Sequence, residues 1–185
     1  MTNTSFSEIE GKRVIILGDV GTGKTSLVRR LLIEAIEKYL KDLTVIDMAP
    51  PRMSINGETI GGHLLEKPDQ RVRYLAPKEV WPPRLKARDP EELISLAEKN
   101  REEIEVLLAT YSKEPSEILF VNDVSIYLQR GDIETLWGAL SKARTLVVNS
   151  YFGERLSDDH GTGISTREKN EVLALAERMD MVIRL

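Results

Sequence analysis

The chain contains no cysteine, and this absence excludes several classes of protein at once. Without thiols there is no disulfide scaffold, no Cys nucleophile, no iron–sulfur cluster and no thiolate-bound metal. Only two histidines, His63 and His160, are present, which argues against a dedicated transition-metal site. No apolar run approaches the roughly 20 residues of a membrane span, and no signal-peptide pattern opens the sequence, so we expect a cytoplasmic protein.

Size and charge fit one ordinary domain. The 185 residues include 41% apolar and 30% charged residues, and the formal net charge is -4. A chain of this length can bury its own core, so we predict a single domain over residues 1–185. The mild acidity argues against non-specific binding to nucleic acid and to anionic membranes, and it leaves the oligomeric state open.

Two kinds of apolar segment alternate along the chain. Short β-branched runs predict buried strands, and longer stretches with apolar residues every three or four positions predict helices. The alternation favours a three-layer α/β fold with a five-stranded parallel sheet covered on both faces. The predicted strands cover 13–17, 43–48, 117–123, 145–149 and 181–185, and the predicted helices cover 27–42, 89–111, 132–140 and 165–179.

Capping signals mark three of the helix starts. Asp89 precedes a proline and is followed three residues later by Glu92, which predicts a capping box. Asp132 predicts a second N-cap, and Ser165 with Glu168 predicts another capping box.

The segment 50–90 differs from the rest because it holds seven of the eight prolines. We therefore predict a lid-like insertion after the second strand instead of regular helix. Within it, residues 53–60 predict a β-hairpin, since Asn56-Gly57 supplies the positive φ angles of a type I′ turn. Residues 68–90 carry six basic and three acidic side chains, so this basic loop is a candidate site for a protein partner or an anionic substrate.

The strongest motif is Gly18-Asp-Val-Gly-Thr-Gly-Lys24-Thr25, which satisfies the phosphate-loop pattern between a predicted strand and a predicted helix. Glycines let the backbone curl until several amide hydrogens point at one anion. Lys24 then places a charge on the β- and γ-phosphates, the Thr25 hydroxyl ligates Mg²⁺, and the helix N-terminus faces the phosphates. The expected nucleotide-binding residues are Gly18, Asp19, Val20, Gly21, Thr22, Gly23, Lys24, Thr25 and Ser26.

On this motif the chain resembles the P-loop NTPase superfamily, and the resemblance covers the alternating order of the whole chain. It implies a second strand that ends in a carboxylate, the Walker B element, and Ile118-Leu-Phe-Val-Asn-Asp123 is similar to it. A carboxylate in this place can hold Mg²⁺ directly or through water. The resemblance thus implies Mg²⁺ as cofactor, Thr25 and Asp123 as its ligands, and Lys24 and Asp123 as catalytic residues.

The residue after Asp123 is Val124, so the Asp-Glu pair typical of many motor, AAA and RecA-like ATPases is missing. In that pair the glutamate activates the attacking water. The departure favours the kinase–GTPase branch, in which the Walker B strand lies beside the phosphate-loop strand. It implies the strand order 2-3-1-4-5, with Gly18, Asp47, Asp123 and Asn149 converging at the carboxyl ends of the strands.

Two of these strand-end residues have open roles. Asp47 is a candidate catalytic residue that orients the nucleophile or a magnesium-bound water, and a solvated strand end is the alternative. Asn149 is a candidate nucleotide-binding residue. It stands where guanine-specific GTPases carry Asn-Lys-x-Asp, but only the Asn agrees, so the sequence does not choose between ATP and GTP. Asp158 or Asp159 would be the acceptor for guanine.

The remaining charged candidates lie in loops. Any one of four arginines could reach the γ-phosphate as an internal arginine finger, hold an anionic substrate, or stay solvated. The segment His160-Gly-Thr-Gly-Ile-Ser lacks the Gly-Lys-Thr context, so no second phosphate site is predicted there. His63 and His160 are interpreted as ordinary loop residues. The four arginines are Arg71, Arg73, Arg84 and Arg88.

Three functions follow as expectations. The first is Mg²⁺-dependent hydrolysis of ATP or GTP, coupled to a conformational change of the 50–90 loop or of a partner. The second is a kinase for a small molecule or nucleotide, in which the loop would exclude water. The third is a nucleotide-sensing binding module with slow turnover, because no catalytic base is obvious.

Overall fold

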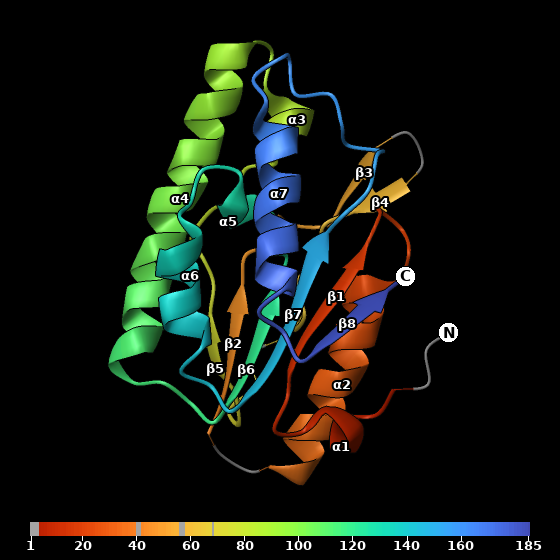
Figure 1. The fold of residues 1–185 in the computed structure, drawn as a ribbon, viewed down its shortest axis with the longest axis vertical. Helices are drawn as coiled ribbons and strands as arrows, with labels where there is room; N and C mark the ends of the chain where they lie inside the picture. Colours follow the sequence, from red (N-terminus) through yellow and green to blue (C-terminus); the bar gives the residue numbers. More distant parts are fainter. Residues whose placement is uncertain (1–3, 40–41, 56–57, 68) are drawn as a thin grey trace.

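A twisted parallel sheet of six strands runs through the centre of the molecule, with helices on both faces (Figure 1). The computed structural model describes residues 4–39, 42–55, 58–67 and 69–185. The order across the sheet is β5-β2-β6-β7-β1-β8, and all neighbouring strands are parallel. Its strands are β1 (Arg13–Gly18), β2 (Leu43–Asp47), β5 (Arg73–Leu75), β6 (Ile118–Asn122), β7 (Thr145–Tyr151) and β8 (Met181–Arg184).

The helices fall into two layers because alternate strand residues point to opposite faces. On one face, Val14 and Ile16 pack with α1 and α2, while on the other Ile15 and Leu17 pack with α4, α5, α6 and α7. The predicted three-layer α/β architecture is therefore confirmed. The helices are α1 (Phe6–Ile9), α2 (Lys24–Lys38), α3 (Pro83–Lys86), α4 (Pro90–Lys113), α5 (Ser125–Leu128), α6 (Ile133–Leu140) and α7 (Ile164–Ala176).

The predicted strand count and strand order are wrong. A sixth strand, β5, pairs with β2 at one edge; its three residues between proline-containing segments were too short to predict. The predicted order 2-3-1-4-5 fails because β7 lies between β6 and β1, so the Walker B-like strand is not adjacent to the phosphate-loop strand. Every residue of β7 is buried, as a central strand requires, but local pattern cannot say which buried strand takes the centre.

Asp89 and Asp132 are N-caps as predicted, but the capping box at Asp89 is only half formed, because Glu92 accepts from Arg88 N and not from Asp89 N. Asp89 accepts a hydrogen bond from Glu92 N, and Asp132 accepts one from Thr135 N, both at 2.8 Å. The capping box of Ser165 and Glu168 is wrong: α7 begins at Ile164 after a glycine, and Glu168 is buried. Helix α2 ends at Lys38, before the predicted end near residue 42.

The insertion contains the predicted hairpin, formed by β3 (Met53–Ile55) and β4 (Glu58–Ile60), which pair antiparallel. The predicted type I′ turn at Asn56-Gly57 lies outside the described residues. The insertion is attached to the rest of the fold at several points. Arg29 donates to the carbonyl oxygens of residues 63 and 64, and Arg73 donates to carbonyl oxygens near the end of α4.

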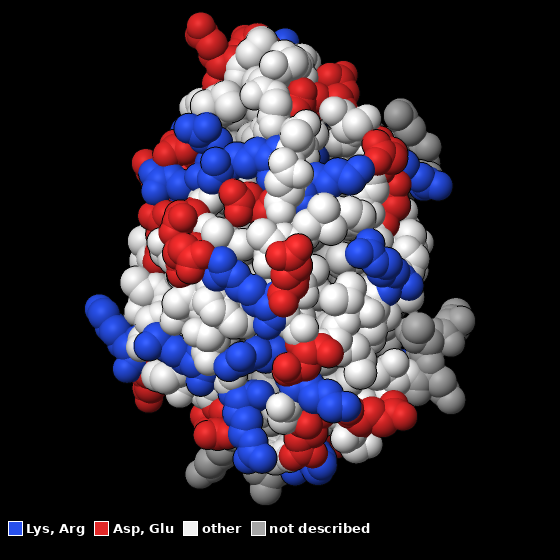
Figure 2. Space-filling view, in the orientation of Figure 1, with Lys and Arg blue, Asp and Glu red and all other residues white. Residues whose placement is uncertain are grey.

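Charges on the face shown in Figure 2 are interspersed, with basic and acidic side chains side by side. The four arginines of the basic loop follow the same rule. Arg71 pairs with Asp69, Arg88 with Glu92, Arg84 with Glu168, and Arg73 lies 3.9 Å from Glu114. Within the described residues, no helix combines the length and apolarity needed to cross a bilayer.

Candidate functional site

The loop between β1 and α2 has the curled shape that its glycines predict. Gly21 and Gly23 have positive φ angles of 75° and 93°. Gly18 is needed for a different reason: a Cβ there would lie 2.6 Å from Thr22 Oγ1 and 2.8 Å from the Leu185 carbonyl oxygen. The motif therefore forms a tight backbone turn at the N-terminus of a 15-residue helix, which is an arrangement that favours anions.

The Asp19 side chain turns away from the curl of this loop. Its carboxylate accepts from Val20 N at 2.6 Å and from Glu154 N at 3.0 Å. Burial raises the pKa of Asp19, but the backbone donors outweigh burial, and the net pKa is lowered. Within the described residues, the backbone N–H groups of residues 21–25 donate to no protein atom. They remain available to a bound anion.

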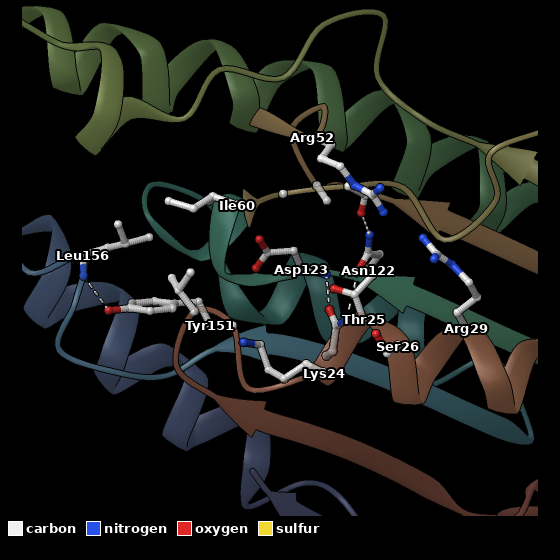
Figure 3. A pocket seen from close by; sticks show the side chains of 17 residues that line it. Lys24, Thr25, Ser26, Arg29, Arg52, Ile60, Asn122, Asp123, Tyr151 and Leu156 are labelled. Carbon is white, nitrogen blue, oxygen red and sulfur yellow. Dashed lines mark hydrogen bonds between the residues drawn. The ribbon is translucent and has the colours of Figure 1, made fainter. Parts of the chain in front are cut away.

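A pocket of about 260 Å³ opens above this loop. The loop and the first turns of α2 form its floor, the ends of β6 and β7 form one wall, and the insertion forms another (Figure 3). Asp123 is the only carboxylate among the described residues that line it. The lining consists of Val20, Gly21, Gly23, Lys24, Thr25, Ser26, Arg29, Ala49, Arg52, Ile60, Gly61, Gly62, Asn122, Asp123, Asn149, Tyr151 and Leu156.

Lys24 supplies a partly desolvated cation at the centre of the pocket. Its Nζ donates to the Asp19 carbonyl oxygen at 2.6 Å, so the side chain folds back along its own loop. Burial lowers the pKa of Lys24, while the negative charges of Asp123 and Asp19 oppose that shift. A phosphate bound beside Lys24 would stabilise the charged ammonium group, which burial disfavours by removing its hydration.

Asp123 is held in place by its backbone as well as its side chain. It follows the last residue of β6 in a left-handed conformation with a φ of 59°. Its N–H donates to Asn149 Oδ1 at 2.5 Å, and its Oδ1 accepts from Ser125 Oγ at 2.5 Å. The second carboxylate oxygen is left for other partners, and the side chain points into the pocket (Figure 3).

The donor set of the pocket fits a hard divalent cation. The Thr25 hydroxyl and the Asp123 carboxylate line the same pocket, and both offer oxygen ligands. Mg²⁺ prefers oxygen and commonly takes one or two protein ligands, with phosphates and waters completing its shell. The two residues predicted to hold Mg²⁺ are thus compatible with it.

Asp47 is buried behind the pocket and does not line it. Its carboxylate is 0% exposed and accepts from Leu64 N, Tyr74 Oη and Asn122 Nδ2 at 2.6–2.7 Å. Asn149, in contrast, reaches the pocket wall, although its amide is already engaged by Asn122 and by the Asp123 backbone. The predicted convergence of strand-end residues therefore places Asp123 and Asn149 at the pocket and leaves Asp47 in the layer beneath.

The arginines at the pocket are not those that the sequence singled out. Arg29 and Arg52 line it, while the four predicted arginines do not. Arg29 could have been predicted, because it lies one helical turn after Thr25 and Ser26. Arg52 carries no local signal, since its place depends on the path of the insertion.

The remaining candidates lie elsewhere in the fold. Asp158 and Asp159 accept from backbone N–H groups of their own loop, at His160, Gly161 and Ser165. His160 contacts the Ala87 carbonyl oxygen through its ring at 3.3 Å. The His63 ring nitrogen Nδ1 lies 3.6 Å from Asp47 Oδ1, beneath the pocket.

Sequence comparison adds no family to this geometry. No protein-family model matches the chain, and no curated protein matches it significantly in sequence.

Proposed function

We propose that the chain binds a nucleoside triphosphate, ATP or GTP, together with Mg²⁺ and hydrolyses it. The observation that carries the proposal is the shared pocket of the free loop amides, Lys24, Thr25 and Asp123. These groups offer the amide cradle, the cation and the oxygen ligands that polyphosphate binding requires.

Each residue has a defined task in this proposal. The loop amides bind the phosphates, and Lys24 releases the Asp19 carbonyl to contact the β- and γ-phosphates. Thr25 and Asp123 would hold Mg²⁺, which would supply positive charge beside the phosphate oxygens. Asp123 is also the nearest described candidate to orient the attacking water, because the pocket lining offers no other carboxylate.

The strand order bears on the branch of the superfamily. The kinase–GTPase branch places the Walker B strand beside the phosphate-loop strand, whereas β7 separates them here. This separation supports the motor, AAA and RecA-like ATPases instead, although Val124 stands where many of them carry the glutamate of the Asp-Glu pair. Asn149 of β7 consequently lies between the phosphate loop and Asp123, which supports a role for its amide at the site.

The insertion is the part of the chain expected to respond to nucleotide. Arg52, Ile60, Gly61 and Gly62 line the pocket, so the segment contacts whatever binds there. Two cations, Arg29 and Arg52, stand at the end of the pocket opposite Tyr151 and Leu156 (Figure 3). An anionic acceptor at these arginines would turn the reaction into phosphotransfer, which is the second candidate function.

The first test is calorimetric titration of the protein with ATP and GTP in Mg²⁺, followed by measurement of phosphate release. We expect Lys24→Ala to weaken binding about a hundredfold and to abolish phosphate release. Lys38→Ala is the matched control, because Lys38 lies on the same helix but is exposed and pairs with Glu10. A wild-type protein that binds neither nucleotide would end the proposal.

An isotopic label at the γ-phosphate of the nucleotide distinguishes the three candidate functions. Label that appears only in free phosphate supports hydrolysis, and label on an added acceptor supports a kinase. Tight binding without release of label supports the slow-turnover binding module.

A further inference from the structure

Four hydrogen bonds connect the insertion to Asp123 across the carboxyl ends of four strands. Tyr74 Oη donates to Asp47 Oδ2 at 2.6 Å, and Asn122 Nδ2 donates to Asp47 Oδ1 at 2.7 Å. Asn149 Nδ2 donates to Asn122 Oδ1 at 2.9 Å, and Asp123 N donates to Asn149 Oδ1 at 2.5 Å. The chain therefore runs through β5, β2, β6 and β7 in the order in which they lie in the sheet.

The chain has one direction. A carboxylate only accepts, so Asp47 turns the NH₂ end of Asn122 towards itself and leaves the Asn122 oxygen facing Asn149. Asn149 must then present its NH₂ to Asn122 and its oxygen to the Asp123 N–H, which only donates. The Gly62 carbonyl oxygen, which also belongs to the insertion, accepts from Asn122 Nδ2 at 3.0 Å, so Asp47 and Gly62 together set which atom of Asn149 meets Asp123.

Burial makes this orientation expensive to change. Asp47, Asn122 and Asn149 are 0%, 1% and 2% exposed, so a reversed amide would leave a donor facing a donor without water to replace it. Burial and the nearby Asp47 charge raise the pKa of Tyr74, which keeps the phenol protonated as a donor. Leu64 N donates to the same carboxylate at 2.7 Å, so the insertion fixes Asp47 at two points.

We propose that Asp47 is a positioning residue: through Asn122 and Asn149 it fixes the Asp123 backbone and so places the Asp123 carboxylate for Mg²⁺. This inference rests on the proposed function. It gives Asp47 a role without contact to nucleotide, and it makes Tyr74 and Leu64 the points at which a movement of the insertion would reach Asp123.

The test measures nucleotide affinity twice for each protein, with a fluorescent ATP analogue in EDTA and in a titration of Mg²⁺. Asp47→Asn keeps the shape of the side chain but can also donate, so it no longer requires the NH₂ of Asn122 and leaves the Gly62 carbonyl as the remaining acceptor that orients this amide. We expect unchanged affinity in EDTA, because the loop amides and Lys24 are untouched. The Mg²⁺ concentration that gives half of the metal-dependent gain should rise roughly tenfold, as for other residues that orient metal ligands.

Tyr74→Phe is the second variant, and it tests the positioning role of Asp47 if Asp47→Asn does not fold. It should shift the Mg²⁺ titration in the same direction by a smaller factor. Tyr111→Phe is its control, because Tyr111 is buried more deeply than Tyr74 and its hydroxyl donates to the Ser116 carbonyl oxygen at 3.2 Å, away from this chain of hydrogen bonds. Tyr111→Phe should lower stability without moving the Mg²⁺ titration.

The outcomes separate the two proposals. Wild-type protein that binds no nucleotide defeats the proposed function and the inference with it. Wild-type protein that binds with Mg²⁺, while Tyr74→Phe and any folded Asp47→Asn show the wild-type Mg²⁺ titration, defeats the inference alone. Equal loss of affinity in EDTA and in Mg²⁺ would also overturn it, because a general structural defect does not select the metal.

Discussion

The loop before α2 and the loop before α7 both place two left-handed glycines around a threonine, but their side chains differ. Gly21 and Gly23 have φ angles of 75° and 93°, and Gly161 and Gly163 have φ angles of 73° and 76°. In each loop a threonine hydroxyl donates to the carbonyl oxygen of the aspartate three residues earlier, at 3.0 Å in the first and 2.8 Å in the second. The two loops share these features, although His160 has a positive φ of 53° and Val20 at the matching position does not.

The aspartates of the two loops are used in opposite ways. Asp19 turns outward to Glu154 N, and a Cβ on Gly153 would lie 2.2 Å from the Asp19 carboxyl carbon. Asp159 turns inward, and its carboxylate accepts from Gly161 N at 3.1 Å and Ser165 N at 2.9 Å. The second loop therefore carries its own acceptor, while Asp19 occupies only Val20 N of the first loop and, among the described residues, the N–H groups of residues 21–25 have no protein partner.

The residues that begin the two helices differ as well. Lys24 faces the pocket at the start of α2, whereas Ile164 at the start of α7 is buried with Leu93 and Ala97. The proposed function therefore depends on more than the glycine turn that the two loops share. Among the described residues, the first loop adds amides without a protein partner and a cation that faces a pocket.

The largest effect is expected from Lys24→Ile, which gives the start of α2 the residue that begins α7. The substitution removes the charge-assisted contacts to phosphate, which are worth roughly 3 kcal/mol or about a hundredfold in affinity. Calorimetric titration with ATP and Mg²⁺ measures the loss. Nucleotide affinity within threefold of the wild type would show that the loop amides alone suffice and that the contrast between the loops is wrong.

A second prediction concerns Glu168, which sits in the first turns of α7 where α2 has apolar Val28. Glu168 accepts from Arg84 and Gln129, yet burial raises its pKa from 4.5 to about 7, against the attraction of Arg84 and with some help from the Asp123 charge. The folded state thus holds this proton more tightly than the unfolded chain. Its contribution to stability is complete below about pH 4.5 and is lost as the pH rises through about 7.

The contribution of Glu168 to the free energy of unfolding should fall by roughly 3 kcal/mol between pH 4.5 and pH 8. Urea unfolding at several pH values should show the free energy of unfolding falling over this range in the wild type. Glu168→Gln should remove that part of the slope. Parallel slopes for the two proteins would mean that the Arg84 ion pair, and not burial, governs this carboxyl group.

Glu168 also shows where sequence reasoning stops. Ser165 and Glu168 match a capping box, but Gly163 already provides the left-handed start of α7, and Glu168 turns inward to Arg84. The partner, 84 residues away, comes from the insertion, so no local pattern reveals it. Long-range pairs of this kind override local capping signals.

The curled loop at residues 18–25 could be predicted because all of its requirements are local: a strand end, glycines at fixed spacing, and a lysine at a helix start. The position of Asp123 at the end of β6 follows from the same kind of local pattern. The strand order and the role of Asp47 could not be predicted, because both depend on which strands become neighbours. The alternation of strands and helices is compatible with more than one order.

A third prediction tests the internal anion of the second loop with Asp159→Ala. The substitution removes the carboxylate that accepts from Gly161 N and Ser165 N. This loss should lower the free energy of unfolding by about 1–2 kcal/mol. Added phosphate should then stabilise the variant more than the wild type, because it can replace the missing carboxylate. Thermal unfolding in chloride and in phosphate buffers at equal ionic strength measures both effects, and a stability equal to wild type would show that Asp159 does not fill the loop.

The smallest effect is expected at the glycines themselves. Gly161→Ala meets nothing within 4 Å, so its cost is the left-handed conformation alone, about 1 kcal/mol. Gly138 in α6 also has nothing within 4 Å of a Cβ but lies inside a helix, so Gly138→Ala should stabilise the fold by about 0.5–1 kcal/mol. Urea unfolding of the two variants should therefore give changes of opposite sign. Equal signs would show that the φ angle of 73° at Gly161 is not a constraint on the loop, and that the shared shape of the two turns does not depend on glycine.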